Sequence, residues 1–144
     1  DKLVIDIAGE ASVLMTMQEM STAVQYKLPI KIFILNNQYM GMVRQWQELL
    51  HEKNYSESYT AALPDFVKLA EAYGCVGIQA TKPDELDDKI NEMININEPV
   101  IFDCRVDPAE NCFPMIPSGK PHNQMLLGPE DEKEEVSDEG KTLV

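Results

Sequence analysis

Cationic residues are scarce in this sequence of 144 residues. It holds 12 Lys and Arg against 25 Asp and Glu, which gives a formal net charge of −13 at pH 7. Nucleic-acid binding depends on cationic groups that neutralise phosphates, so this balance argues against a nucleic-acid partner. Apolar runs long enough to span a bilayer are also missing, and we expect neither a signal peptide nor a membrane partner.

Cysteine is sparse as well, and its spacing excludes the common metal sites. The three cysteines, Cys75, Cys104 and Cys112, are an odd number without the paired spacing of metal ligands. Cys75 and Cys104 fall in strand-like runs, where we expect them to act as small apolar residues in a reducing environment. The histidines His51 and His122 stand apart from any cysteine, so we assign no metal to them. These features favour a cytoplasmic protein.

What is present is an alternation of strand-like and helix-like segments. Apolar runs predict strands over residues 3–7, 32–35, 75–80 and 99–106, and helical periodicity fills the intervals. The run 32–35 is apolar throughout, which is typical of a central strand buried on both faces of a parallel sheet. The order predicts a doubly wound α/β fold, with a mostly parallel sheet and helices on both faces.

Three of the expected helices have recognisable ends. The first begins at Ser12 and closes before Pro29; the second lies between Asp65 and Gly74; the third has Thr81 as its N-cap. Their apolar stripes are expected to hold Val13, Met17, Met20 and Val24 in the first helix, Phe66, Val67, Leu69, Ala70 and Tyr73 in the second, and Leu86, Ile90, Met93 and Ile94 in the third, with Met15 also in the core.

Two strand ends predict a ligand site at one edge of the sheet. Gly9 and Ala11 are small enough for the backbone to approach a ligand, and Ser12 begins a helix whose N–H groups favour anions. Glu10 would repel a bound phosphate unless a cation lay between them, and Mg²⁺ prefers oxygen ligands. One of the asparagines 36–37 would add an amide oxygen. The pattern predicts a magnesium–diphosphate clamp; the alternative is a capped helix start and an asparagine-rich turn.

These residues also carry a resemblance to a known family. Gly9-Glu10-Ala11, followed after 24 residues by Asn36-Asn37, resembles the thiamine diphosphate motif, which has Gly-Asp-Gly, a similar gap and Asn-Asn. The stretches "GMVRQWQ" (41–47), "PDFVKLAEAYG" (64–74) and "PMIPSG" (114–119) are similar to the catalytic subunits of acetolactate synthases (acetohydroxyacid synthases). The sequence departs from the motif at Glu10, which is one methylene longer than the usual aspartate. Direct and water-mediated magnesium binding both stay open.

The resemblance implies a fragment of the C-terminal, cofactor-binding domain of a three-domain enzyme. It divides residues 1–128 into a partial thiamine diphosphate- and magnesium-binding domain at 1–107 and an arm over the active-site mouth at 108–128. Residues 129–144 are strongly acidic and have no apolar period, so we expect them to form a disordered acidic tail. In this family the glutamate that activates the cofactor comes from the N-terminal domain of a partner subunit. We therefore assign no catalytic residue here and expect the fragment alone to be inactive.

The resemblance also assigns site residues. Magnesium would be held by Glu10, Asn37 and the backbone carbonyl of Tyr39. Val43, Trp46 and Ser118 would line the substrate channel, although the helical spacing of Trp46 also fits a residue of the core. The cofactor-binding residues would be Gly9, Glu10, Ala11, Ser12, Asn37, Tyr39, Met40, Gly41 and Met42, the last of them near the thiazolium ring.

The implied reaction decarboxylates pyruvate on thiamine diphosphate and joins the remaining two carbons to a second 2-keto acid. With pyruvate or 2-oxobutanoate as acceptor, the products lead to branched-chain amino acids. The resemblance further implies a structural FAD held mainly by missing domains, a homodimer or tetramer, and a possible small regulatory subunit. Two alternatives stay open: another thiamine diphosphate enzyme, of the glyoxylate carboligase or pyruvate oxidase type, and a non-catalytic domain with a degenerate metal site.

Overall fold

The computed structural model describes residues 2–129, so the predicted acidic tail lies outside the described residues except for Pro129. The chain divides into two compact units, which we describe separately. Among the described residues, 2–39 with 60–108 form the first unit, and 40–59 with 109–129 form the second. Over residues 2–129, none of the helices combines the length and apolarity that a bilayer crossing needs. The predicted boundaries of the domain, arm and tail stay predictions.

A four-stranded parallel sheet organises the first unit, as predicted. The strands are β1 (Ile5–Gly9), β2 (Lys31–Asn36), β3 (Val76–Ala80) and β4 (Val100–Arg105), in the spatial order β1-β2-β4-β3. The first strand lies two residues later than the predicted range 3–7, because its ladder with β2 runs from the pair Ile5–Lys31 to the pair Gly9–Leu35. Backbone pairing therefore extends through small residues that the apolar pattern did not include.

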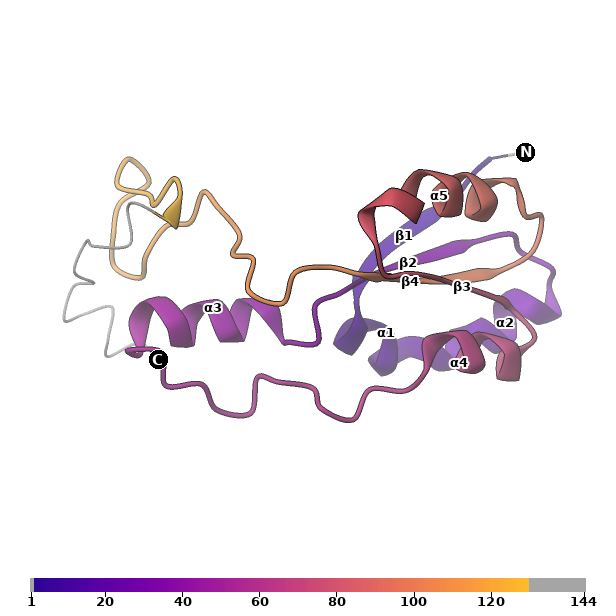
Figure 1. The fold of residues 1–144 in the computed structure, drawn as a ribbon, viewed down its shortest axis with the longest axis horizontal. Helices are drawn as coiled ribbons and strands as arrows, with labels where there is room; N and C mark the ends of the chain where they lie inside the picture. Colours follow the sequence, from indigo (N-terminus) through magenta and orange to yellow (C-terminus); the bar gives the residue numbers. More distant parts are fainter. Residues whose placement is uncertain (1, 130–144) are drawn as a thin grey trace. The chain divides into compact units, whose positions relative to one another are not determined.

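Helices cover the two faces of this sheet unequally (Figure 1). On one face α1 (Glu10–Thr16), α2 (Met20–Gln25) and α4 (Phe66–Tyr73) enclose a core with Ile34 and Ile101 at its centre. On the other face α5 (Leu86–Asn95) packs over β3 and β4, where Phe102 is fully buried. This second layer does not reach β1, where Ile7 remains 68% exposed.

This unequal cover corrects one prediction about β2. The strand is central, as predicted, because it pairs with β1 on one side and β4 on the other. Ile34 is fully buried, but Leu35 points to the uncovered face and is 44% exposed. Burial of the run 32–35 on both faces was therefore a wrong prediction at its last residue.

The first predicted helix is broken into three pieces and begins earlier than expected. Its N-cap is Gly9 in an extended conformation, so Glu10, rather than Ser12, is the first helical residue. A short 3₁₀ segment, η1 (Met17–Glu19), separates α1 from α2. The break rotates the apolar stripe: Val13 and Met20 are buried, whereas Met15 is 72% exposed and does not join the core.

The predicted ends are correct for the second of the predicted helices, and the predicted N-cap is wrong for the third. Asp65 caps α4 by accepting a hydrogen bond from the Lys68 N–H at 3.1 Å, and Gly74 ends the helix with φ = 82°, both as predicted. Thr81 is not an N-cap, because the Glu85 carboxylate instead accepts the Thr81 N–H and starts the 3₁₀ turn η2 (Pro83–Glu85) ahead of α5. In α5, Met93 is buried but Ile94 is exposed, which corrects the predicted stripe.

The second unit consists of α3 (Gly41–Leu50), the loop after it and the segment from residue 109. An antiparallel bridge joins Met115 to Leu126 through two backbone hydrogen bonds of 2.9 and 2.7 Å. Both of these side chains are buried. In the first unit, Cys75 and Cys104 are buried free thiols, as predicted, and burial raises the pKa of each.

Candidate functional site

The carboxyl ends of β1, β2 and β4 bring polar side chains to one edge of the first unit's sheet. Glu10 follows β1 directly, Asn36 is the last residue of β2, and Arg105 is the last residue of β4. Because the strands are parallel, these ends lie at the same edge, and Asn36 pairs in register with Arg105. In α/β sheets of this kind, this is the edge where ligands bind.

Glu10 is a buried carboxylate with an unpartnered oxygen. Its side chain is 1% exposed, and its Oε1 atom has no hydrogen-bond partner. Burial raises the pKa of Glu10 above its ordinary value, while the backbone amides of Glu10 and Asn37 and the charge of Arg105 lower it. The negative charge of Asp103 adds to the rise in this pKa. A buried charge without a partner is costly, so this oxygen is suited to a cation.

Asp103 forms the centre of a polar network that joins three strands. Its side chain is fully buried on β4. Its Oδ1 accepts a hydrogen bond from Asn36 Nδ2 on β2, and its Oδ2 accepts one from Gln79 Nε2 on β3, both at 2.8 Å. Arg105 Nε lies 3.3 Å from the same Oδ2. The carboxylate therefore has partners on both oxygens.

The loop after β2 is folded by two consecutive asparagine turns. Asn36 Oδ1 accepts the Gln38 N–H at 3.2 Å, and Asn37 Oδ1 accepts the Tyr39 N–H at 3.1 Å. Between them Gln38 adopts a left-handed conformation with φ = 61°, and its carbonyl accepts both the N–H and the hydroxyl of Thr60. The asparagine-rich turn that the sequence left as an alternative is therefore present.

This turn does not exclude a metal site, because an amide oxygen has two lone pairs. Each asparagine oxygen accepts one hydrogen bond in its turn and keeps a second lone pair, and Asn36 is in addition fixed to the buried Asp103 through its Nδ2. Over residues 2–129, no cluster of three or more His, Cys, Asp or Glu side chains could hold a metal. A set of one carboxylate, one amide oxygen and one carbonyl fits Mg²⁺, which usually takes its other ligands from water and substrate phosphates. The orphaned Glu10 oxygen is consistent with that set.

Gly9, Ala11 and Ser12 lie at the start of α1 in the first unit, and the remaining predicted site residues lie in the second unit. Met40 and Gly41 form the start of α3, and one face of this helix borders a cavity of about 690 Å³. Among the residues that line the cavity are Met42, Val43 and Trp46. Trp46 is half-buried and belongs to neither apolar core cluster of the first unit. Ser118 is half-buried elsewhere in this unit and does not line the cavity, so its shared role with Trp46 stays a prediction.

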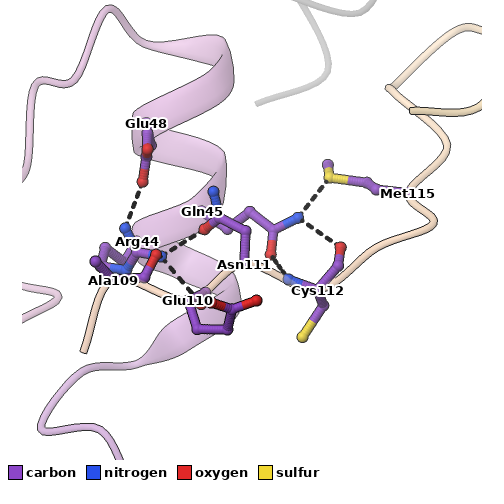
Figure 2. Close-up of polar contacts among 8 residues, drawn as sticks. All are labelled: Arg44, Gln45, Glu48, Ala109, Glu110, Asn111, Cys112 and Met115. Carbon is purple, nitrogen blue, oxygen red and sulfur yellow. Dashed lines mark hydrogen bonds and ion pairs between the residues drawn. The ribbon is translucent and has the colours of Figure 1, made fainter. Parts of the chain in front are cut away.

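A second polar cluster, which sequence reasoning missed, attaches residues 109–115 to α3 (Figure 2). Arg44 makes an ion pair with Glu48 and donates to the carbonyls of Ala109 and Glu110 at 2.9 and 3.2 Å and to Asn111 Oδ1 at 2.5 Å. The Gln45 carboxamide pairs with the backbone of Cys112, accepting its N–H at 2.7 Å and donating to its carbonyl at 3.0 Å. Arg44 and Gln45 lie in the stretch "GMVRQWQ" (41–47), in which only the resemblance to acetolactate synthases was recognised from the sequence.

Sequence reasoning also missed Asp103, Gln79 and Arg105. A signal was available, because Asp103 interrupts the apolar run of a strand predicted to be buried. A charged residue in such a position is seldom fully buried unless it is paired.

Comparisons with known proteins agree with this geometry. Residues 1–104 match the family described as thiamine pyrophosphate enzyme, C-terminal TPP binding domain. The chain is 49% identical over 125 residues to an acetolactate synthase large subunit of Cyanidium caldarium, covering 86% of this chain and 21% of that protein. It is 44% identical over 130 residues to the acetolactate synthase isozyme 3 large subunit of Escherichia coli, covering 88% and 23%.

A solved structure shows the same relationship at lower identity. A thiamine diphosphate-dependent 4-hydroxybenzoylformate decarboxylase of Rhodococcus jostii superposes with a TM-score of 0.68 at 27% identity, covering 74% of this chain and 20% of that one. The chain thus spans about a fifth of the length of the relatives it matches. The family match, the parallel sheet and the polar groups at its carboxyl edge agree, and the chain belongs to the family of C-terminal TPP-binding domains of thiamine pyrophosphate enzymes.

Proposed function

We propose that this chain is the diphosphate-binding part of an acetolactate synthase large subunit. The similarity to acetolactate synthase large subunits extends over 86–88% of the chain at 44–49% identity in the two relatives described above. The observation that carries the proposal is the orphaned, buried oxygen of Glu10 at the same sheet edge as the Asn37 turn. When bound, thiamine diphosphate supplies the nucleophilic carbon and the electron sink for decarboxylating a 2-keto acid.

Three groups of this chain would hold magnesium: the Glu10 carboxylate, the Asn37 amide oxygen and the Tyr39 backbone carbonyl. Glu10 supplies the negative charge in a place where water is excluded, and the Asn37 turn holds a neutral oxygen in a fixed direction. Gly9, Ala11 and Ser12 of the first unit would bind the diphosphate. Met40, Gly41 and Met42 of the second unit are assigned to the cofactor by the resemblance alone. The longer side chain of Glu10 binds the ion directly or through water.

The apolar face of α3 would contact the 2-keto acid substrates, pyruvate and 2-oxobutanoate. Its cavity is bordered by Met42, Val43 and Trp46, and ligand sites of this size are typically apolar with few polar groups. Ser118 would join this channel. A flat indole at such a wall would distinguish acceptors that differ by one methylene.

The complete enzyme is proposed to act in branched-chain amino acid biosynthesis as a cytoplasmic homodimer or tetramer. It would carry FAD on parts of the polypeptide beyond this chain and would accept a small regulatory subunit. The pathway, the subunits and the FAD are inferred from the similarity to acetolactate synthase large subunits, and the cytoplasmic location is inferred from the free thiols of Cys75 and Cys104.

Cofactor titration and product analysis of the complete enzyme test the proposal. We expect saturable thiamine diphosphate binding that requires Mg²⁺, and 2-acetolactate from pyruvate as the main product. Tartronate semialdehyde from glyoxylate would instead indicate a glyoxylate carboligase, and acetyl phosphate would indicate a pyruvate oxidase. An enzyme that binds no thiamine diphosphate at saturating Mg²⁺ would be a non-catalytic domain with a degenerate site, and the proposal would be wrong.

A further inference from the structure

Asp103 has no assigned role in metal or cofactor binding, yet its position is unusual. It is a fully buried carboxylate in a parallel strand, at the edge that carries Glu10 and the Asn37 turn. Removing a carboxylate from water is unfavourable unless its oxygens are well bonded. Here both oxygens have partners, and one of these is Asn36, the residue directly before the proposed metal ligand Asn37.

We propose that Asp103 is a positioning residue that orients the Asn36 side chain and so fixes the turn that presents Asn37 and the Tyr39 carbonyl to magnesium. The inference rests on the proposed function, because it assigns Asp103 a role in the same metal site. Gln79 and Arg105 support Asp103 from the other side.

The orientation of Asn36 follows from donor and acceptor chemistry. A carboxylate oxygen only accepts hydrogen bonds, so the group of Asn36 that faces Asp103 must be its NH₂ group. The Asn36 carbonyl oxygen is then directed to the Gln38 N–H. With the amide reversed, two donors would face each other at Gln38 and the turn would lose its first hydrogen bond.

The turn needs this external support because its backbone is strained. Gln38 is a non-glycine residue in the left-handed region, with φ = 61°, a conformation that persists only where surrounding contacts determine it. Other contacts also act on the loop: Thr60 bonds the Gln38 carbonyl, the Val106 N–H donates to the Asn36 carbonyl at 3.1 Å, and the Asn37 side chain accepts the Tyr39 N–H. None of these three bonds involves the Asn36 side chain, which is oriented by Asp103 on one side and by the Gln38 N–H on the other.

The decisive variant is Asp103→Asn, which keeps the shape of the side chain and replaces the carboxylate with an amide. The introduced amide offers one donor group and one acceptor group, where the network requires two acceptors. Either its NH₂ group faces Asn36, which reverses that amide against Gln38, or it faces Arg105 Nε, which is always a donor. In the first arrangement the turn loses its first hydrogen bond; in the second, Asn36 is held by a neutral amide oxygen instead of a carboxylate, which Gln79→Leu would leave in place.

Exchanging the two side chains provides the matching rescue. In the double variant Asn36→Asp with Asp103→Asn, the amide now on β4 donates to the carboxylate now on β2 and accepts from Gln79 and Arg105. The carboxylate on β2 accepts from this amide and from the Gln38 N–H. Every hydrogen bond of the network is kept. Only the bond between positions 36 and 103 has its donor and acceptor exchanged. The control is Gln79→Leu. Gln79 is exposed, and this change removes the hydrogen bond to Asp103 Oδ2 while Asn36 keeps its hydrogen bond to Asp103 Oδ1.

The experiment measures the Mg²⁺ dissociation constant of the complete apoenzyme by calorimetry at saturating thiamine diphosphate, together with the thermal unfolding midpoint without metal. We expect Asp103→Asn to weaken Mg²⁺ binding about 10- to 100-fold, as is usual for groups that orient metal ligands. The exchange variant should return to within about threefold of wild type, and Gln79→Leu should stay within about threefold.

Several outcomes would overturn the inference. Asp103→Asn that binds Mg²⁺ as wild type does, or an exchange variant that folds but stays as weak as the single variant, would show that Asp103 does not position the turn. If Asp103→Asn fails to fold, the exchange variant alone decides the question by its Mg²⁺ affinity. Failure of the proposed function looks different, because the wild-type enzyme itself would then show no Mg²⁺-dependent cofactor binding.

Discussion

At the scale of single residues, Glu10 combines a cost to the fold with a use in binding. A carboxylate that is buried with an orphaned oxygen destabilises the metal-free protein, and burial accordingly raises its pKa above the ordinary value of 4.5. Such local instability is common where a ligand later supplies the missing partner. The same oxygen would be stabilised by a bound cation.

We therefore predict opposite effects of Glu10→Gln on stability and on binding. In the complete enzyme, the variant should weaken Mg²⁺-dependent thiamine diphosphate binding at least tenfold, whereas Glu10→Asp should be tolerated. The metal-free Glu10→Gln protein should be more stable than wild type near neutral pH, because a buried charge is removed. Calorimetric titration and thermal unfolding measure the two effects.

The pH dependence of this difference follows from the direction of the shift. A carboxyl whose pKa is higher in the folded state binds its proton more tightly when folded, so wild type gains stability as the pH falls through that raised pKa. The stability advantage of Glu10→Gln should therefore shrink on acidification. Unchanged cofactor binding by Glu10→Gln would contradict the metal assignment.

The cavity beside α3 bears on the role of Trp46. Its spacing with Met42 and Leu50 fitted either a core or a channel, and all three line the same cavity. One methylene in an apolar pocket is worth about 1–3 kcal/mol of discrimination. We predict that Trp46→Leu keeps acetolactate formation in the complete enzyme but lowers the preference for 2-oxobutanoate over pyruvate about tenfold or more.

Competition between the two acceptors, followed by product quantification, measures this ratio. The resemblance to acetolactate synthases implies that sulfonylurea herbicides bind in the same channel, so sulfonylurea inhibition should fall in parallel. If the acceptor ratio and the inhibition are both unchanged, Trp46 is a packing residue and the acceptor is selected elsewhere.

At the scale of elements, α4 and β3 pack against each other with almost no space between their backbones. A Cβ atom added at Gly77 would lie 2.8 Å from the backbone Cα and carbonyl oxygen of Val67, closer than real Cβ contacts. The helix backbone therefore rests directly on the strand, and any side chain at this position pushes the two elements apart.

We predict that Gly77→Ala destabilises the protein by about 1–3 kcal/mol, the usual cost of overpacking a well-packed core. Gly128→Ala is the matched control, because nothing lies within 4 Å of a Cβ added there. Chemical denaturation of both variants measures the difference. Equal stability of the two would show that α4 shifts without cost.

The elements could be predicted from the sequence where local chemistry determines them. Asp65 and Gly74 mark the ends of α4 because a side-chain cap and a left-handed glycine act within the helix itself. The ends of β1 and the exposure of Leu35 could not be predicted, because they depend on which strand pairs where and on how far α5 reaches. At the candidate site, Glu10 and Asn37 carry a motif, whereas the Asp103 network becomes visible only when β2, β3 and β4 are side by side.

At the scale of the whole molecule, the two units contribute different information about function. The thiamine pyrophosphate family match ends at residue 104, within the first unit, and this unit carries the polar sheet edge common to cofactor binding. That match also includes α3 of the second unit, whereas the similarity to acetolactate synthase large subunits extends over 125–137 residues and adds part of the segment from 109. We infer that features particular to acetolactate synthase large subunits lie in this added segment.

The last prediction concerns what the isolated chain lacks. Its two buried carboxylates at the sheet edge are both committed, Asp103 to Asn36, Gln79 and Arg105, and Glu10 to the proposed metal. Neither is available to move protons on the cofactor, and the resemblance places the activating glutamate in another domain. We predict that the purified chain, given pyruvate, thiamine diphosphate and Mg²⁺, forms no acetolactate above a protein-free background, while the complete enzyme forms it under the same conditions. Acetolactate from the isolated chain would mean that an activating group lies within these 144 residues, and the placing of the activating glutamate in another domain would then be wrong.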